Sequence, residues 1–227
     1  MTTTAFFDLD YTLLNTSSGM IYIREIVKQK RVPWWFVGYV GLGYQLKRFD
    51  FGQSHIKLIS YVGQHGVTEA KQFFKDWVQQ SLLPRLTPAA LNKIAWHKAQ
   101  GHRVVINSAT IEEIVKPVAE HLDLGPDYLC TRLAVQGDRY TGALDGPLCY
   151  GQGKVYWAKS WCRENGLAFP KAVNYFYTDS SSDLPLLELR PSSLRETTNP
   201  LEEGLTAVTS FIYLTRRAVF SPLSVSR

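Results

Sequence analysis

The chain of 227 residues is poor in cysteine, with only Cys130, Cys149 and Cys162. These three cysteines form no C-x-x-C pair and have no partnering histidine cluster, and their odd number argues against a disulfide framework. We therefore interpret them as reduced thiols and expect a cytoplasmic protein. The five histidines show no spacing typical of metal ligands, so the sequence predicts no histidine-based metal centre.

We predict neither a secretory leader nor a membrane-spanning segment. Asp8 and Asp10 interrupt its first apolar run, so no signal peptide is predicted. Val32–Leu46 (VPWWFVGYVGLGYQL) carries no charge for fifteen residues, but a spanning helix needs about 20. We interpret this stretch as a buried helix, and an interfacial membrane or lipid-binding surface is the alternative.

Charge of one sign is not strongly concentrated. The 25 Lys and Arg residues exceed the 20 Asp and Glu residues by a net charge of +5, and their closest cluster is Lys28, Lys30 and Arg31. Such scattered basic residues are typical of a solvated surface, and we expect no nucleic-acid partner. An anionic small-molecule substrate fits the charge equally well.

Two patterns of apolar residues divide the chain. Within residues 16–83 the spacing is helical, with predicted helices around Ile21–Val27, Ile56–Val62 and Ala70–Val78. Thr68 is a candidate N-cap for the last of these helices. We interpret residues 16–83 as a small helical cap domain, and residues 1–15 and 84–227 as the domain into which it is inserted.

Strands and helices alternate in the larger domain. The predicted helices are Ala89–Gln100, Ile111–Leu122 and Gly153–Asn165, and the predicted strands after the first are Arg103–Asn107, Tyr128–Thr131 and Asn174–Thr178. A hairpin is expected within Leu133–Leu144. This alternation predicts an α/β fold with a parallel sheet, whose ligands bind beyond the carboxyl ends of the strands.

Polar side chains stand where several of these strands end. Asp8 and Asp10 follow the first strand, and two neighbouring carboxylates repel each other unless a cation or a proton offsets their charge. Later strand ends or helix starts bring Ser108, Lys154, Asp179 and Asp183. Carboxylates for a divalent cation, a hydroxyl for phosphate oxygens and an ammonium for the remaining charge together indicate a phosphate site with a metal.

Four segments, in their order and spacing, resemble the motifs of the haloacid dehalogenase superfamily of phosphatases. FDLDYTL resembles the first motif, Asn107–Thr110 the second, Lys154 in GQGKV the third and Asp179–Asp183 the fourth. A helical insertion directly after the first motif resembles subfamily IB, the branch that includes phosphoserine phosphatase. The resemblance extends to about Glu188 and implies a Rossmann-like three-layer core with an all-helical cap.

The resemblance also implies roles for these residues. Asp8 would be the nucleophile that forms an aspartyl phosphate, and Asp10 the general acid and base. Mg²⁺ would be the cofactor, with Asp8, Asp10, Asp179 and Asp183 as the candidate metal set. Asp8, Asp179 and the backbone carbonyl of Asp10 would be the ligands, and Asp183 would lie beside them or close to the metal. The candidate substrate-binding residues are Thr12, Ser108, Ala109, Lys154 and Ser182.

The function implied is a cytoplasmic Mg²⁺-dependent phosphatase for a small phosphomonoester. The alternatives are a phosphotransferase with the same intermediate, and a non-catalytic phosphate-binding or membrane-associated module. Ser17 stands where phosphoserine phosphatase carries a glutamate that meets the substrate's ammonium, so phosphoserine is disfavoured. The aromatic residues of Val32–Leu46 favour a leaving group with a ring or an apolar chain, such as histidinol phosphate or a lipid phosphate.

The end of the chain departs from the resemblance. Relatives continue after the fourth motif with a strand and a helix, whereas Leu189–Asn199 has poor strand character. No element is predicted for Phe211–Arg227, and a frayed tail is one interpretation of this segment.

Overall fold

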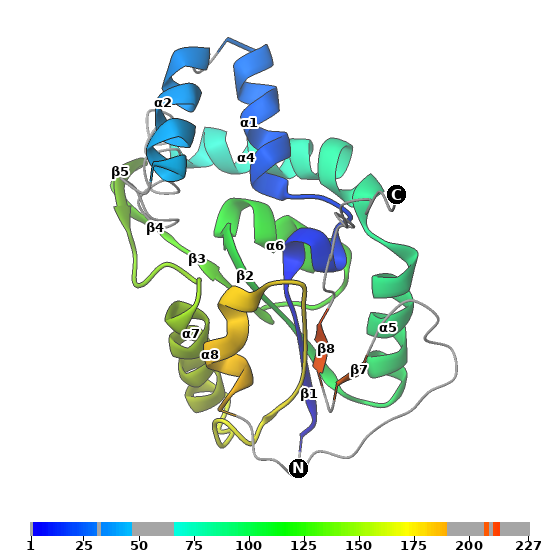
Figure 1. Ribbon diagram of the computed structural model, residues 1–227. Helices are drawn as coiled ribbons and strands as arrows, with labels where there is room; N and C mark the ends of the chain where they lie inside the picture. The colour runs from blue at the N-terminus through cyan, green and yellow to red at the C-terminus, as the bar shows by residue number, and fades with distance from the viewer. Residues whose placement is uncertain (1, 31–32, 47–65, 190–206, 209–210, 214–227) are drawn as a thin grey trace, which may run out of the picture.

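A largely parallel sheet forms the centre of the computed structural model, which describes residues 2–30, 33–46, 66–189, 207–208 and 211–213 (Figure 1). The strand order is β3-β2-β1-β6-β8-β7, and only β7 runs antiparallel to its neighbour. The strands are β1 (Thr4–Phe7), β2 (Arg103–Ile111), β3 (Tyr128–Thr131), β6 (Val173–Thr178), β7 (Ala207–Val208) and β8 (Phe211–Tyr213). A separate hairpin pairs β4 (Leu133–Gln136) with β5 (Arg139–Leu144).

Both faces of the sheet are buried, because successive side chains of a strand point to opposite faces. In β1, Ala5 and Phe7 belong to the hydrophobic cluster that includes residues of α5 (Pro88–Ala99) and α6 (Glu112–His121). Phe6 belongs to the cluster on the other face, with residues of α7 (Gln152–Glu164) and α8 (Leu184–Leu187). The result is a three-layer α/β fold, which confirms the predicted fold class.

The helices α1 (Ser18–Lys28), α2 (Trp34–Gln45) and α4 (Val67–Trp77) lie together beyond one end of the sheet (Figure 1). The helical turns η3 (Val78–Leu82) and η4 (Leu83–Arg85) lead from α4 back to the core. Phe74 and Trp77 of α4 are buried in the same cluster as the sheet residues Ala5 and Phe7. The boundaries of the cap, residues 16 and 83, stay a prediction, and the helix predicted around Ile56–Val62 lies outside the described residues.

Several local predictions were wrong. The strand predicted to end at Asn107 continues to Ile111, and its register with β3 shifts between Asn107 and Ile111. The N-cap of α4 is Gly66 rather than Thr68, whose hydroxyl donates to Asp138 Oδ1 at 3.4 Å instead. The stretch Val32–Leu46 does form a helix, but that helix leaves several large apolar side chains exposed rather than buried.

The end of the chain is also not a frayed tail throughout. Phe211–Tyr213 forms β8, which pairs in parallel with β6, so that Thr178 faces Tyr213 across the ladder. Most of Leu189–Asn199, for which the sequence shows poor strand character, lies outside the described residues. The strand that extends the sheet beyond β6 comes later in the chain.

Candidate active site

Asp8 occupies the position directly after β1. Its backbone N–H donates to Tyr177 O at 2.9 Å, so the pairing of β1 with β6 extends up to this residue. The chain then makes the helical turn η1 (Leu9–Leu13), in which Tyr11 takes a left-handed backbone conformation with φ of 55°. Leu9 and Leu13 are fully buried and anchor the turn. The Asp8 carboxylate is thereby held, largely buried, at the carboxyl edge of the sheet.

A buried ammonium joins Asp8 to the fourth motif. Lys154 Nζ, on α7, lies 2.9 Å from Asp8 Oδ1 and 2.7 Å from Asp183 Oδ2. The hydroxyl of Thr178 also donates to Asp183 Oδ2, at 2.6 Å. Lys154 and Asp183 are both buried, so these hydrogen bonds are made out of contact with bulk water. Asp8 and Lys154, 146 positions apart in the sequence, thus meet, as the motif resemblance implied, whereas the contact of Lys154 with Asp183 was not predicted.

The close charges shift the protonation of this group. Burial, together with the negative charges of Asp183 and Asp10, raises the pKa of Asp8 to about 7, although Lys154 opposes that rise. Burial alone would lower the pKa of Lys154, but the two carboxylates outweigh it and raise the pKa above its ordinary value. Lys154 therefore stays an ammonium, and Asp8 exchanges its proton near neutral pH.

Gly153 allows Lys154 to reach this position. A Cβ at residue 153 would lie 1.8 Å from the backbone oxygen of Leu148, closer than two atoms can approach. The start of α7 therefore packs directly against the preceding loop, and Gly151, with φ of 54°, makes the turn into the helix. The close approach explains Gly153 of GQGKV, and the positive φ explains Gly151.

Asp10 is held from the side of the cap. Its carboxylate accepts hydrogen bonds from the backbone N–H of Ser18 at 2.9 Å and from the hydroxyl of Ser17 at 3.2 Å. Ser17 is also the N-cap of α1, and the hydroxyl of Ser18 lies 3.0 Å from that of Thr110 at the end of β2. Burial raises the pKa of Asp10 above its ordinary value, although the hydrogen bonds from Ser18 and Ser17 oppose that rise.

The start of α1 was not recognised in the sequence as part of the site. Ser17 was considered only as the replacement of a glutamate, and Ser18 and Thr110 were not assigned any role. A serine directly before a helical pattern is an N-cap signal, and it could have placed Ser17 near the first motif. Its hydrogen bond to Asp10 depends on the fold of η1.

The predicted substrate-binding residues lie at the same edge of the sheet. Ser108 is buried in β2 and its Oγ accepts from the N–H of Thr110 at 3.2 Å. Ser182 is half-buried, and its hydroxyl lies 2.7 Å from that of Ser180 in the turn after β6. Ala109 is half-buried beside Ser108. The hydroxyl of Thr12 is buried and has no hydrogen-bond partner among the described residues.

Asp179 completes the acidic edge. It follows β6 directly, and burial together with the negative charges of Asp183 and Asp10 raises its pKa. Within the described residues, no group of three or more His, Cys, Asp or Glu side chains is arranged to hold a metal ion. The site that the motif resemblance implies uses only two carboxylates, those of Asp8 and Asp179, with one backbone carbonyl.

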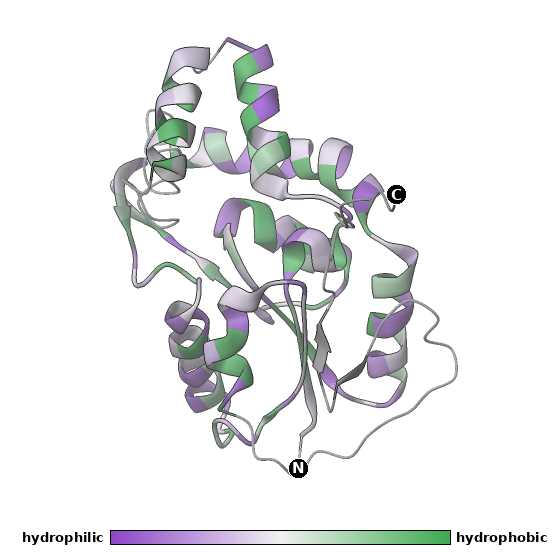
Figure 2. Cartoon of the chain, in the orientation of Figure 1, coloured by the Kyte–Doolittle hydropathy of each residue, from purple (hydrophilic) through white to green (hydrophobic). Residues whose placement is uncertain are grey.

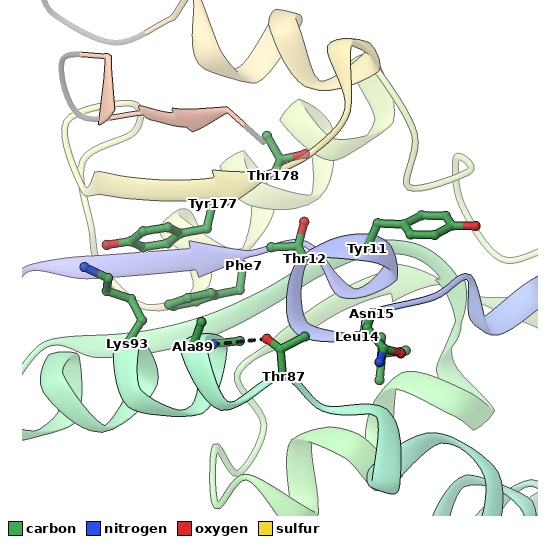
Figure 3. A pocket seen from close by; sticks show the side chains of 11 residues that line it. Phe7, Tyr11, Thr12, Leu14, Asn15, Thr87, Ala89, Lys93, Tyr177 and Thr178 are labelled. Carbon is green, nitrogen blue, oxygen red and sulfur yellow. Dashed lines mark hydrogen bonds between the residues drawn. The ribbon is translucent and has the colours of Figure 1, made fainter. Parts of the chain in front are cut away.

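An apolar pocket of about 230 Å³ adjoins this edge, between η1, the start of α5 and the end of β6 (Figure 3). The rings of Phe7 and Tyr177 stack in its wall with centroids 4.4 Å apart. Thr12 and Thr178 also line it, whereas the carboxylates of the site do not. Of its lining residues only Thr12 is a predicted site residue. Phe7 and Tyr11 belong to the same first motif but have no predicted role, and most of the others come from separate elements.

Comparison with known proteins agrees with this geometry. The family model described as haloacid dehalogenase-like hydrolase matches residues 5–188. The chain belongs to this family. Its match extends from the first strand through the turn that carries Asp183, and so includes all four motifs.

Two relatives of this haloacid dehalogenase-like chain carry names that describe a function. A probable phosphatase of Mycobacterium tuberculosis is 30% identical over 82% of the chain, and the chain spans 66% of that protein, just under two thirds. A histidinol-phosphatase of Neisseria meningitidis is 28% identical over 82% of the chain and 86% of the relative.

Solved structures share the fold. A Bordetella pertussis protein of unknown function superposes with a TM-score of 0.75 and 25% identity, over 83% of this chain and 87% of that one. A phosphoserine phosphatase solved as a phospho-aspartyl intermediate analogue gives a TM-score of 0.54 with 22% identity, over 82% of each chain. The likeness to the phosphoserine phosphatase structure supports the assignment of the fold.

Proposed function

We propose that this protein is a Mg²⁺-dependent phosphatase that hydrolyses a small phosphomonoester through an aspartyl-phosphate intermediate on Asp8. The observation that supports the proposal most directly is the buried group of Asp8, Lys154 and Asp183 beside Asp10. A nucleophilic carboxylate, a fixed ammonium and a carboxyl with a raised pKa are the groups that two-step phosphoryl transfer requires. The names of the mycobacterial and neisserial relatives agree with this assignment.

Asp8 is the nucleophile of the first step. Lys154 holds its Oδ1, so Oδ2 is the oxygen that attacks phosphorus. The P–O bond to the alcohol breaks as the new P–O bond forms, and the leaving oxygen takes the proton of Asp10. In the second step water attacks the same phosphorus, Asp10 takes back a proton, and the carboxylate of Asp8 leaves with inorganic phosphate as the product.

The acidic edge suits a hard divalent cation. Burial raises the pKa values of Asp8, Asp10 and Asp179, and neighbouring carboxylates raise those of Asp8 and Asp179 further, so a cation with oxygen ligands would offset the buried negative charge. Asp8, Asp179 and the backbone carbonyl of Asp10 are the proposed ligands. Bound there, Mg²⁺ would offset negative charge on the phosphoryl group during transfer.

Asp183 acts through Lys154 in this proposal. Its carboxylate accepts from both Lys154 and Thr178 and is buried, so we assign it to positioning the ammonium rather than to binding the metal. Ser17 acts in a similar way on Asp10. Because the side chain of Ser17 is a neutral hydroxyl bonded to Asp10, it supplies no charge for a substrate ammonium, and phosphoserine is not expected to be the best substrate.

The test is phosphate release from a panel of phosphomonoesters with and without Mg²⁺, together with trapping of ³²P-labelled protein. We expect Asp8→Asn to lose more than about 10³-fold in kcat and to trap no label. Asp10→Asn should still become labelled by an aryl phosphate, whose leaving group needs little protonation, and should hold the label longer than wild type. Label in Asp8→Asn, or release unaffected by this change, would refute the mechanism.

The same experiment separates hydrolysis from phosphotransfer. An added alcohol such as glycerol competes with water for the phosphoryl group, and the ratio of glycerol phosphate to inorganic phosphate measures the competition. A phosphatase releases mostly inorganic phosphate, whereas a phosphotransferase needs its acceptor alcohol for turnover.

A further inference from the structure

The helix α2 exposes an unusual set of side chains. It carries no charged residue, and yet Trp34, Trp35, Tyr39, Leu42 and Leu46, the last just beyond its end, are between 53% and 78% exposed. A helix without charges is normally buried, because water-facing positions favour polar side chains. Exposed apolar groups that gather in one place mark an interaction surface.

Most of these side chains share one face of the helix. Trp35, Tyr39, Leu42 and Leu46 follow one another at spacings of four, three and four residues, which is the period of a helical stripe. Trp34, the most exposed of the set, begins the helix. The stripe therefore runs along α2 from the end nearest α1 (Figure 1).

The net positive charge of the protein lies within residues 16–83, the predicted cap domain that contains α2. Residues 16–83 contain nine Lys and Arg against four Asp and Glu, a net charge of +5, while the rest of the chain contains sixteen of each. Within the described residues, Arg24, Lys28 and Lys30 are exposed on α1 and just after it, next to the start of α2. Figure 2 shows α2 in pale and green colours beside purple segments of α1, so basic and apolar groups stand side by side.

We propose that the tip formed by the end of α1 and by α2 docks onto the surface of an anionic lipid bilayer. Trp and Tyr prefer the membrane–water interface, because their rings have an apolar body and a polar edge. Lys28 and Lys30 lie where they would meet the phosphates of acidic lipids. No helix within the described ranges is long and apolar enough to cross a membrane, so the contact is with the surface.

The choice of a bilayer over a protein partner rests on this combination. The stripe is rich in tryptophan and tyrosine and lies within a segment, residues 16–83, that has a surplus of positive charge, which matches the negative surface and the aromatic interface of anionic membranes. A second copy of the chain would bring the same positive charge to the contact and be repelled. The inference does not depend on the catalytic proposal.

The test is co-sedimentation of the full-length protein with vesicles of phosphatidylcholine alone or mixed equally with phosphatidylglycerol. We expect binding to the anionic vesicles that weakens with salt, and quenching of tryptophan fluorescence by brominated lipid. Trp34→Ser combined with Trp35→Ser should lower the partition coefficient at least about tenfold. Lys28→Glu combined with Lys30→Glu should lower it by at least about 20-fold, since each basic residue contributes about fivefold.

Matched control variants change exposed residues on α7, outside residues 16–83. Tyr156 on α7 is 54% exposed and Lys159 is exposed on the same helix, so Tyr156→Ser and Lys159→Glu change similar side chains away from the tip. Both controls should bind like wild type, and circular dichroism should show that all variants are folded.

Three results would overturn the proposal. The first is no binding to anionic vesicles at low salt. The second is binding that the tryptophan variant leaves unchanged or that the α7 control variants weaken equally. The third is dimerisation in sedimentation velocity that the tryptophan variant abolishes, without any vesicle binding, because it would assign the face to a second copy of the chain.

Discussion

Replacing Asp183 by asparagine tests whether the buried charges set the pH dependence of the nucleophile. Asp8 and Asp183 bond the same ammonium at 2.9 and 2.7 Å, so their oxygens lie within about 6 Å of each other. Two negative charges at that distance repel by about 3 kcal/mol at an effective dielectric constant of about 20. This energy corresponds to about 2 units of pKa, so Asp183→Asn should lower the pKa of Asp8, which is about 7 in the metal-free protein, by up to about 2 units.

The sign follows from the raised pKa. Asp8 attacks as a carboxylate, so activity is lost as the pH falls through its pKa, and a lower pKa extends activity to lower pH. The assay is the pH dependence of kcat/KM between pH 4 and 9 on one soluble phosphomonoester. We expect the acid limb of Asp183→Asn to move down by about 1 to 2 units, with a lower kcat because Lys154 loses one of its two carboxylates.

An exposed carboxylate provides the control. The side chain of Asp123 is fully exposed and pairs only loosely with Lys98, at 3.7 Å, so Asp123→Asn should leave the acid limb unchanged. The substrate's own ionisation contributes equally to wild type and both variants. An acid limb that stays in place, or moves to higher pH, in Asp183→Asn would refute the reasoning.

Three further predictions concern single contacts. Lys154→Met should lower the free energy of unfolding by about 3 to 5 kcal/mol at pH 8, because two buried carboxylates lose their cation. The loss should be smaller at pH 5, where a carboxyl with a raised pKa holds its proton. Urea denaturation that gives equal losses at both pH values would contradict this. Ser17→Ala should lower kcat about tenfold on an alkyl phosphate, because Ser17 holds Asp10, the proposed proton donor. The loss should be smaller on an aryl phosphate, whose leaving group needs little protonation. Equal losses on both substrates would argue against that role. Gly153→Ala should destabilise the protein by about 1 to 3 kcal/mol or more, because its Cβ meets a backbone oxygen. Gly41→Ala in α2 has open space around it and should stabilise the protein by up to about 1 kcal/mol. A thermal unfolding temperature that changes equally in both variants would contradict the close approach at Gly153.

The elements of the core could be predicted because their signals are local. The buried run before Asp8 and the alternation of strands and helices after residue 84 predict a parallel sheet with its site at the carboxyl edge. The strand Tyr128–Thr131 matches its prediction residue for residue, and the other predicted core helices and strands that the structure describes differ by a few residues at their ends. The strand Phe211–Tyr213 was missed, because three apolar residues far from the fourth motif carry no signal for pairing with β6.

By itself, the sequence determined which residues carry charge and in what order the motifs follow, and from these the α/β fold and the grouping of Asp8 with Lys154 could be predicted. Only the tertiary structure decided that Asp183 holds Lys154, that Ser17 holds Asp10, and that the charge-free helix α2 faces outward. Periodicity reports what lies along one element and on which side of it. Which side chains meet, and which stay exposed, depends on how elements distant in sequence pack together, since hydrogen bonds and burial act over a few ångströms in space.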